Sequence, residues 1–301
     1  QDRQQGRAWG CASCRCGHRE SRRALRAIPS VSTVASGIPA LNAPTGWRVL
    51  DFISDLHLRA EDGLTFETWK RYLAETPADA LFILGDLFEV WVGDDAADGP
   101  GFEHDCARIL SVAGQRVAIH FMPGNRDFLL GERFLRASGM TGLGDPTVLV
   151  FGGQRWLLSH GDALCLDDVP YQQFRRMVRD PAWQRDVLAR SLDDRRALAR
   201  HIREQGTRSA DDDPRDYADV DPEAARRWLR AARAVTLIHG HTHRPGQHEL
   251  ERVSSMAHHD AEDPAGLRRI VLSDWDAGAS PPRAQVLRLS GAGLQRVDIV
   301  P

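Results

Sequence analysis

Apolar runs and polar blocks alternate along most of this chain. Five runs rich in Val, Ile, Leu and Phe have the composition of buried strands: 49–53, 81–84, 117–122, 156–159 and 235–238. Between the first two runs, apolar residues recur at helical spacing, as at Phe66, Trp69 and Leu73. Strands that alternate with helices predict a parallel sheet built from βαβ units.

The later part of the chain predicts a second sheet and a helical insertion. The runs 148–151 and 155–159 flank two glycines and predict a hairpin. Four C-terminal runs predict a mostly antiparallel second sheet: 247–252, 267–273, 284–289 and 295–300. Residues 166–232 carry helical spacing instead. We therefore expect an α/β fold, a two-sheet β-sandwich flanked by helices, with an inserted helical lid at about 166–232.

A short polar block follows each of the first five runs. The blocks are Asp55-Leu-His57, Gly85-Asp86, Gly124-Asn125-Arg126-Asp127, His160-Gly-Asp162 and Gly240-His241-Thr-His243. Loops at strand ends of α/β sheets are where sites are built. Carboxylate, amide and imidazole donors without cysteine suit Mn²⁺, Fe or Zn²⁺. They are too many for one metal with an open position, and two metals that share one carboxylate would use them all.

Composition narrows the class of protein. The hydrophobic content of 42% is ordinary for a soluble protein, and the net charge of −3 argues against bulk nucleic-acid binding. Since no stretch reaches 18 apolar residues, we expect no transmembrane helix. Residues 1–45 are rich in Arg, Gln, Ser and Gly without a sustained period. We expect them to be a disordered extension, with the catalytic domain covering 46–301.

The order of the five blocks resembles the signature of the calcineurin-like metallophosphoesterases, from about Trp47 to the C-terminus. Longer blocks resemble one branch of that family, the enzymes that hydrolyse UDP-2,3-diacylglucosamine to UMP and 2,3-diacylglucosamine 1-phosphate in lipid A synthesis. These blocks are 85–95, 124–128, 160–168 and 239–245. The resemblance implies a phosphoric-anhydride hydrolase that acts at the cytoplasmic face of the inner membrane, as a peripheral protein.

The resemblance also implies two Mn²⁺ ions per chain, with an activated water between them as nucleophile. One ion would be held by Asp55, His57, Asp86 and His243. The other would be held by Asp86, Asn125, His160 and His241, so that Asp86 is shared. The implied catalytic residues are Asp86, Asn125 and Arg126, and the implied substrate contacts are Asn125, Arg126, Asp168 and His241.

Arg126 favours a diphosphate substrate. Many relatives carry His at this place, which can protonate an alkoxide leaving group. An arginine stays charged and cannot act as a general acid, but it can bind a phosphate bidentately. A diphosphate releases a phosphate anion that needs no proton. Arg126 therefore favours cleavage of a phosphoric anhydride over hydrolysis of an alkyl ester.

Two interpretations of the helical insertion stay open. Its helices carry nine arginines and four acids between 171 and 203. They also have apolar positions at Phe174, Met177, Trp183, Val187 and Leu188. They are either ordinary amphipathic helices with solvated faces, or a lid that holds acyl chains on its apolar side and meets anionic lipid with its basic side.

The insertion also departs from the family. The family usually shows a Ser, Asn and Lys trio that contacts the substrate, and Gly206, Ala210 and Asp213 stand at those places. Two other functions therefore stay open: a phosphoesterase that acts on a soluble nucleotide diphosphate, or a non-catalytic scaffold. A scaffold of this kind usually loses ligands, and none is missing from the five blocks.

Overall fold

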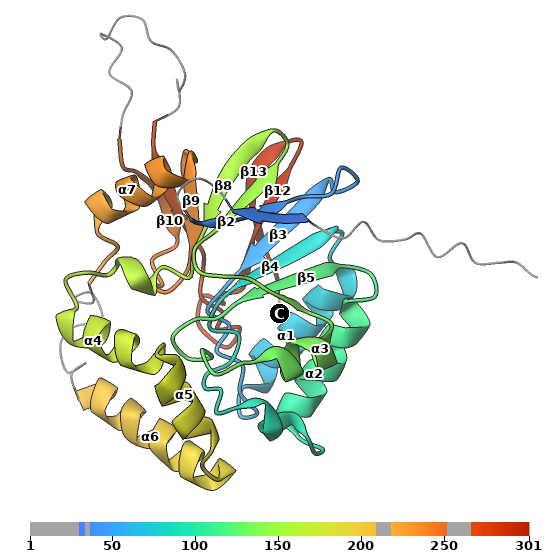
Figure 1. Cartoon of the computed structure of the whole chain (residues 1–301). Helices are drawn as coiled ribbons and strands as arrows, with labels where there is room; N and C mark the ends of the chain where they lie inside the picture. The colour runs from blue at the N-terminus through green and yellow to red at the C-terminus, as the bar shows by residue number, and fades with distance from the viewer. Residues whose placement is uncertain (1–29, 34–36, 209–217, 252–265, 301) are drawn as a thin grey trace, which may run out of the picture.

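The computed structural model describes residues 30–33, 37–208, 218–251 and 266–300, and their strands form two sheets (Figure 1). In this part of the chain the larger sheet has the order β1-β2-β7-β8-β9-β11-β10. Its strands are β1 (Ser30–Thr33), β2 (Pro39–Asn42), β7 (Thr147–Phe151), β8 (Gln154–Leu158), β9 (Thr236–His239), β11 (Arg268–Val271) and β10 (Gly246–Glu249).

The smaller sheet has the order β13-β12-β3-β4-β5-β6. Its strands are β13 (Gly293–Asp298), β12 (Gln285–Ser290), β3 (Val49–Ile53), β4 (Ala80–Leu84), β5 (Ala118–Met122) and β6 (Thr141–Gly142). The pairs β3–β4, β4–β5 and β5–β6 are parallel, as the strand–helix alternation predicts, and β12 joins β3 antiparallel.

Alternation along the strands separates the layers. In β3, Leu50 and Phe52 point between the two sheets, where Phe52 stacks on Phe82 of β4 at 5.1 Å between ring centroids. Ile53 points the other way, into a core with three outer helices. These are α1 (Gly63–Glu75), α2 (Phe102–Ala113) and α3 (Glu132–Ser138), and a 3₁₀ helix, η1 (Asp94–Ala97), precedes α2.

One helix covers the opposite face of the sandwich. Helix α7 (Pro222–Ala232) packs Ala225 and Leu229 on Leu157 and Leu237 of the larger sheet. The result is helix, sheet, sheet and helix in layers, which confirms the predicted two-sheet sandwich flanked by helices. The predicted hairpin is also confirmed, since β7 and β8 pair antiparallel and Phe151 faces Gln154.

Two expectations about strands are wrong. The four C-terminal runs do not form one sheet, because β10 and β11 extend the larger sheet while β12 and β13 extend the smaller one. An alternating pattern shows that a strand is half buried but does not name its partner. Strand β2 lies within 1–45 yet pairs parallel to β7, so at least Pro39–Asn42 belongs to the sandwich. The rest of that extension falls mostly outside the described residues.

Three helices between β8 and α7 form what we call the arm: α4 (Val169–Val178), α5 (Pro181–Leu188) and α6 (Leu192–Arg208). Figure 1 shows the arm beside the sandwich rather than on either sheet. Asp168 and Asp180 cap α4 and α5 through backbone N–H groups, with proline in the first turn. Because α7 packs on the larger sheet, the insertion is shorter than the predicted 166–232.

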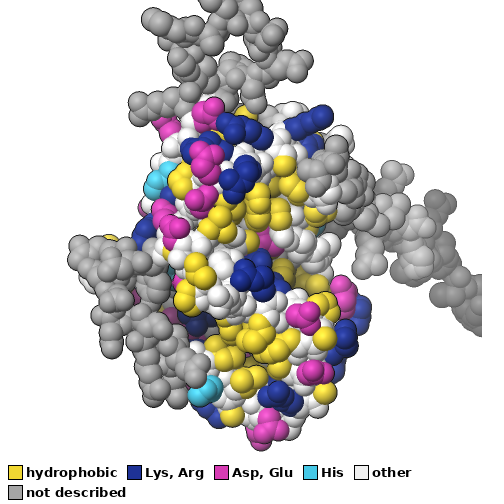
Figure 2. All heavy atoms as spheres, turned by 60° about the vertical axis from the view of Figure 1, so that its left-hand side comes forward, with side chains coloured by type: hydrophobic (Ala, Val, Ile, Leu, Met, Phe, Trp, Pro, Cys, Tyr) yellow, Lys and Arg dark blue, Asp and Glu magenta, His cyan; other side chains and the backbone are white. Residues whose placement is uncertain are grey.

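The apolar positions of the arm serve two surfaces. Val187 is buried in the core beside α1–α3, and Trp183 packs on Phe128 at 6.1 Å between centroids. Met177 and Leu188 are instead exposed. Figure 2 shows apolar side chains in patches on this side of the molecule, with charged side chains between them. Among the described residues, no helix has the length and hydropathy needed to cross a bilayer.

Candidate metal centre

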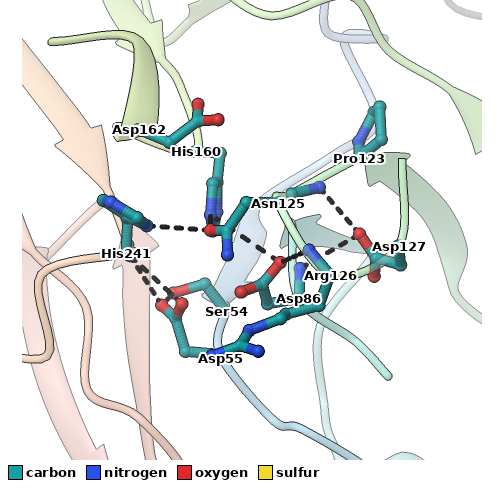
Figure 3. A network of polar contacts seen from close by, with 12 residues as sticks. Ser54, Asp55, Asp86, Pro123, Asn125, Arg126, Asp127, His160, Asp162 and His241 are labelled. Atoms are coloured by element: carbon teal, nitrogen blue, oxygen red, sulfur yellow. Dashed lines mark hydrogen bonds and ion pairs between the residues drawn. The ribbon is translucent and has the colours of Figure 1, made fainter. Parts of the chain in front are cut away.

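The five polar blocks meet where five strands end. Strands β3, β4 and β5 run parallel in one sheet, and β8 and β9 run parallel in the other. Their carboxyl ends therefore deliver all five blocks to the same end of the sandwich, as Figure 3 shows for most of the side chains. Two groups of potential metal ligands result: Asp55, His57 and His243, and Asp55, Asp86 and His160.

We call Asp86, Asn125, His160 and His241 the buried subsite. The Asn125 Oδ1 atom lies 2.8 Å from His160 Nε2 and 2.9 Å from His241 Nδ1. His160 Nε2 lies 3.8 Å from Asp86 Oδ1. His160 Nδ1 donates to the carbonyl oxygen of Leu84 at 2.9 Å, so its Nε2 is the atom turned to the centre. The four side chains converge as the resemblance implies.

We call Asp55, His57 and His243 the open subsite. His57 Nε2 lies 3.3 Å from His243 Nε2, which lies 3.5 Å from Asp55 Oδ1. The His243 side chain is 43% exposed, whereas Asp55 is fully buried. Glu89 Oε2 lies 3.2 Å from His57 Nδ1 and so orients the ring with Nε2 towards the cluster.

The backbone conformation of the loops at the centre is typical of a functional site. Five of the seven predicted ligands have a positive φ, between 48° and 69°: Asp55, His57, Asp86, His241 and His243. Such residues cost of order 1–3 kcal/mol each unless the surroundings hold them, and they concentrate at functional sites. The positive φ values allow these side chains to point towards the centre from loops that follow the strands.

Glycine allows the loops to approach closely. A Cβ atom on Gly124 would overlap the carboxylate of Asp86, and one on Gly85, which has a φ of 90°, would overlap the ring of His160. The glycine in each motif is therefore a packing requirement of the centre.

Charge at the cluster favours a cation. Burial alone would raise the pKa of Asp55, but its hydrogen bond with His243 and the nearby His160 hold that pKa well below its usual range. Burial alone would lower the pKa of His160, but Asp86 and Asp55 raise it to about 9. The carboxylates thus stay ionised and stabilise positive charge on the imidazole, at the place where a divalent metal would bind. The donor set is oxygen and imidazole, so the residues fit a divalent metal ion.

Two supporting carboxylates were missed in the sequence. Asp127 accepts hydrogen bonds from the backbone N–H groups of Gly124 and Leu87, at 2.7 Å each, and so ties two ligand loops together. Its place in the Gly-Asn-Arg-Asp block was the available signal. Glu89, which contacts His57, follows the Gly-Asp block by three residues and shows no local signal of its role.

Arg126 lies at the edge of the centre. Its backbone N–H donates to Asp86 Oδ1 at 2.8 Å (Figure 3). Its Nε atom is buried without a hydrogen-bond partner among the described residues. Burial would raise the pKa of Glu89, but its contact with His57 lowers that pKa, and the charge of Arg126 lowers it further.

The other predicted contacts lie in the insertion. Asp168 caps α4, since its Oδ1 accepts from the backbone N–H of Tyr171 at 3.0 Å. A substrate contact by Asp168 stays a prediction. Ala210 and Asp213 fall outside the described residues, and Gly206 lies in α6.

Comparison with known proteins places the chain in a class. The model of the calcineurin-like phosphoesterase family matches residues 49–245, which contain all five blocks. The chain belongs to the calcineurin-like phosphoesterase family.

Close relatives within that family carry one name, UDP-2,3-diacylglucosamine hydrolase. The one from Chromobacterium violaceum is 42% identical, over 83% of this chain and 98% of that protein. The one from Aromatoleum aromaticum is 42% identical, over 80% of this chain and 93% of that protein. The one from Pseudomonas aeruginosa PAO1 is 42% identical, over 75% of this chain and 90% of that protein.

Proposed function

We propose that this protein hydrolyses the diphosphate bond of UDP-2,3-diacylglucosamine, giving UMP and 2,3-diacylglucosamine 1-phosphate, with two Mn²⁺ ions per chain. The observation that carries the proposal is the convergence of all seven expected ligand side chains in a chain 42% identical to relatives of that name. Two bound divalent ions would supply Lewis acidity and lower the pKa of a bound water.

The residues of the chain provide the selectivity for an anhydride. During hydrolysis the oxygen of water bonds to phosphorus, and the P–O bond to the second phosphate breaks. The second phosphate leaves as an anion, so no side chain has to give it a proton. Arg126 stays charged and, with its unpartnered Nε, can bind a phosphate oxygen of the substrate. Asn125 and His241 would contact the same phosphate from the buried subsite.

The lipid half of the substrate fits the exposed apolar side of the arm. Leu166, Val169, Met177 and Leu188 are each between 41% and 54% exposed. Burial of an acyl chain gains about 0.8 kcal/mol per CH₂ group. We propose that these side chains contact the acyl chains and the cytoplasmic surface of the inner membrane, and that Asp168 contacts the glucosamine end. Sedimentation with anionic vesicles should decrease when Met177 and Leu188 are both replaced by Gln.

A soluble nucleotide diphosphate is the competing substrate class. Purified protein should release UMP from UDP-2,3-diacylglucosamine when Mn²⁺ is added, and should act poorly on UDP-glucose or a CDP-alcohol, which lack acyl chains. Equal rates on the lipid and soluble substrates would contradict the proposed specificity. No UMP release from any of them would favour a scaffold.

A further inference from the structure

One face of helix α4 points at the metal centre. Tyr171, Arg175 and Arg179 are spaced four residues apart, so they lie on one side of the helix. All three side chains are partly buried, whereas Arg176, the next residue after Arg175, is exposed. The face meets the blocks that supply Asn125, His160 and His241, three of the four ligands in the buried subsite.

Two residues of this face hold the His160 block. The Tyr171 hydroxyl donates to Asp162 Oδ2 at 2.7 Å, and Arg175 Nε donates to the same atom at 2.8 Å. Asp162 has no exposed surface and lies two residues after His160. A buried carboxylate is costly unless it is paired, so this block depends on α4 for its charge partner.

The same face reaches the other two blocks. The Tyr171 ring stacks on the ring of His241, with 5.7 Å between centroids and 29° between planes. Arg179 Nη2 donates to the carbonyl oxygen of Gly124 at 2.8 Å, directly before Asn125. The open subsite has different support, since Glu89 contacts His57 and pairs with Arg203 of α6 at 2.8 Å.

We infer that α4 is a positioning element of the buried subsite: Tyr171, Arg175 and Arg179 together fix the three ligand loops around one ion. They act through Asp162, His241 and the Gly124 carbonyl. The inference rests on the metal-dependent function proposed above. It follows that the base of the arm is a fixed part of the centre, whichever ligand the rest of the arm binds.

The test measures Mn²⁺ binding to the metal-depleted full-length protein. Calorimetry gives the affinities, and metal analysis after desalting gives the number of ions retained. Arg175→Met should lower the affinity for one of the two ions by about tenfold or more, the usual effect of removing a supporting group. The other ion should be held as in the wild type. Arg176→Met is the matched control and should bind both ions normally. Arg175→Lys should restore part of the lost affinity.

A second pair of variants covers the case in which Arg175→Met fails to fold. Tyr171→Phe keeps the ring and removes the hydroxyl, and Arg179→Met removes the contact with Gly124. Each variant should have a lower affinity for the same ion. Excess Mn²⁺ should return kcat towards the wild-type value. Equal Mn²⁺ affinities in these variants and the Arg176→Met control would overturn the inference. Normal Mn²⁺ binding without UMP release by the wild type would overturn the proposed function alone.

Discussion

The two candidate subsites both use aspartate and histidine side chains at strand ends, yet they differ in burial and support. In the buried subsite, Asp86 and His160 are at most 2% exposed. Helix α4 contacts the block that contains His160, and Asp127 contacts the block that contains Asp86. In the open subsite, the His243 side chain is 43% exposed, and His57 depends on Glu89 for its orientation. Sequence motifs identify the ligands of both but do not distinguish them.

The difference suggests a division of work. A subsite that is buried and held on several sides needs little rearrangement to bind an ion, so it should retain that ion more strongly. A subsite with an exposed histidine leaves room for a substrate phosphate to approach. The charge of Arg126 helps to lower the pKa of Glu89, the residue that contacts His57 of this subsite. We therefore expect the ion of the open subsite to exchange first.

The largest loss of activity is expected when the ligand that both subsites are expected to share is removed. Asp86→Ala should lower the rate by at least about 10³-fold, because the loss of a metal costs several kcal/mol of transition-state stabilisation. It should also release both ions, as metal analysis of the desalted protein would show. Asp193→Ala, which removes an exposed acid of the arm, is the control. Retention of one tightly bound ion would show that Asp86 is not shared.

Arg126 tests whether the open side receives the substrate. Arg126→His should keep both ions and lose roughly 2–4 kcal/mol of transition-state stabilisation, since one charge-assisted phosphate contact disappears. The measurements are kcat and KM for UMP release, beside the metal content. Arg133→His is a control in a surface arginine that pairs with Asp98 outside the centre. An unchanged rate for Arg126→His would mean that this guanidinium binds no phosphate.

The sequence predicts what lies locally in the chain. A polar block follows its strand directly, so the sequence could predict which seven side chains gather at the centre, whereas Asp168, predicted as a substrate contact, is also the cap of α4. Strand partners are not local, and the fates of β11 and β12 show the consequence: similar apolar runs joined different sheets. Strand β2 was missed because its four residues follow a polar stretch and carry little pattern.

Side chains that support the ligands also escape local reasoning. Both interpretations of the insertion placed its arginines on the surface, facing either solvent or anionic lipid, but several contact other parts of the protein. Arg195 of α6 is 4% exposed and donates to the Val92 carbonyl oxygen and to Asp95. Arg175 and Arg179 are used at the metal centre. An arginine that binds a lipid and one that pairs with a buried carboxylate have the same helical spacing, and only the tertiary contact separates them.

The support of the open subsite can be tested without touching a ligand. Glu89→Gln keeps the shape of the side chain but removes the charge beside His57, so affinity for the more exchangeable ion should fall about 10- to 100-fold. The buried ion should be unaffected, in contrast to the α4 variants. Calorimetric titration with Mn²⁺ measures both constants, and Glu132→Gln, an exposed acid of α3, is the matched control. Loss of the buried ion instead would contradict the assignment of Glu89 to the open subsite.

A histidine outside the centre sharpens the comparison from the other side. His120 is buried like His160, with 2% and 0% of the residue exposed, respectively. However, His120 stacks on Phe82 at 4.9 Å between centroids, and neither of its ring nitrogens has a partner among the described residues. Burial lowers the pKa of His120 to about 4, whereas the carboxylates raise the pKa of His160 to about 9. Ligand chemistry therefore shows in the neighbours of a buried histidine, and not in its burial.

The smallest expected effect follows from His120. Because its folded-state pKa lies below the unfolded value, the unfolded chain binds more protons between pH 6.5 and 4, and stability should fall as the pH decreases through that range. From pH 8 to 5.5 this one group should lower the free energy of unfolding by about 1 kcal/mol. Urea unfolding of the wild type and His120→Phe at both pH values measures the difference, since phenylalanine can occupy the stacked position without a titrating group. If both proteins lose equal stability on acidification, His120 is not held neutral by burial.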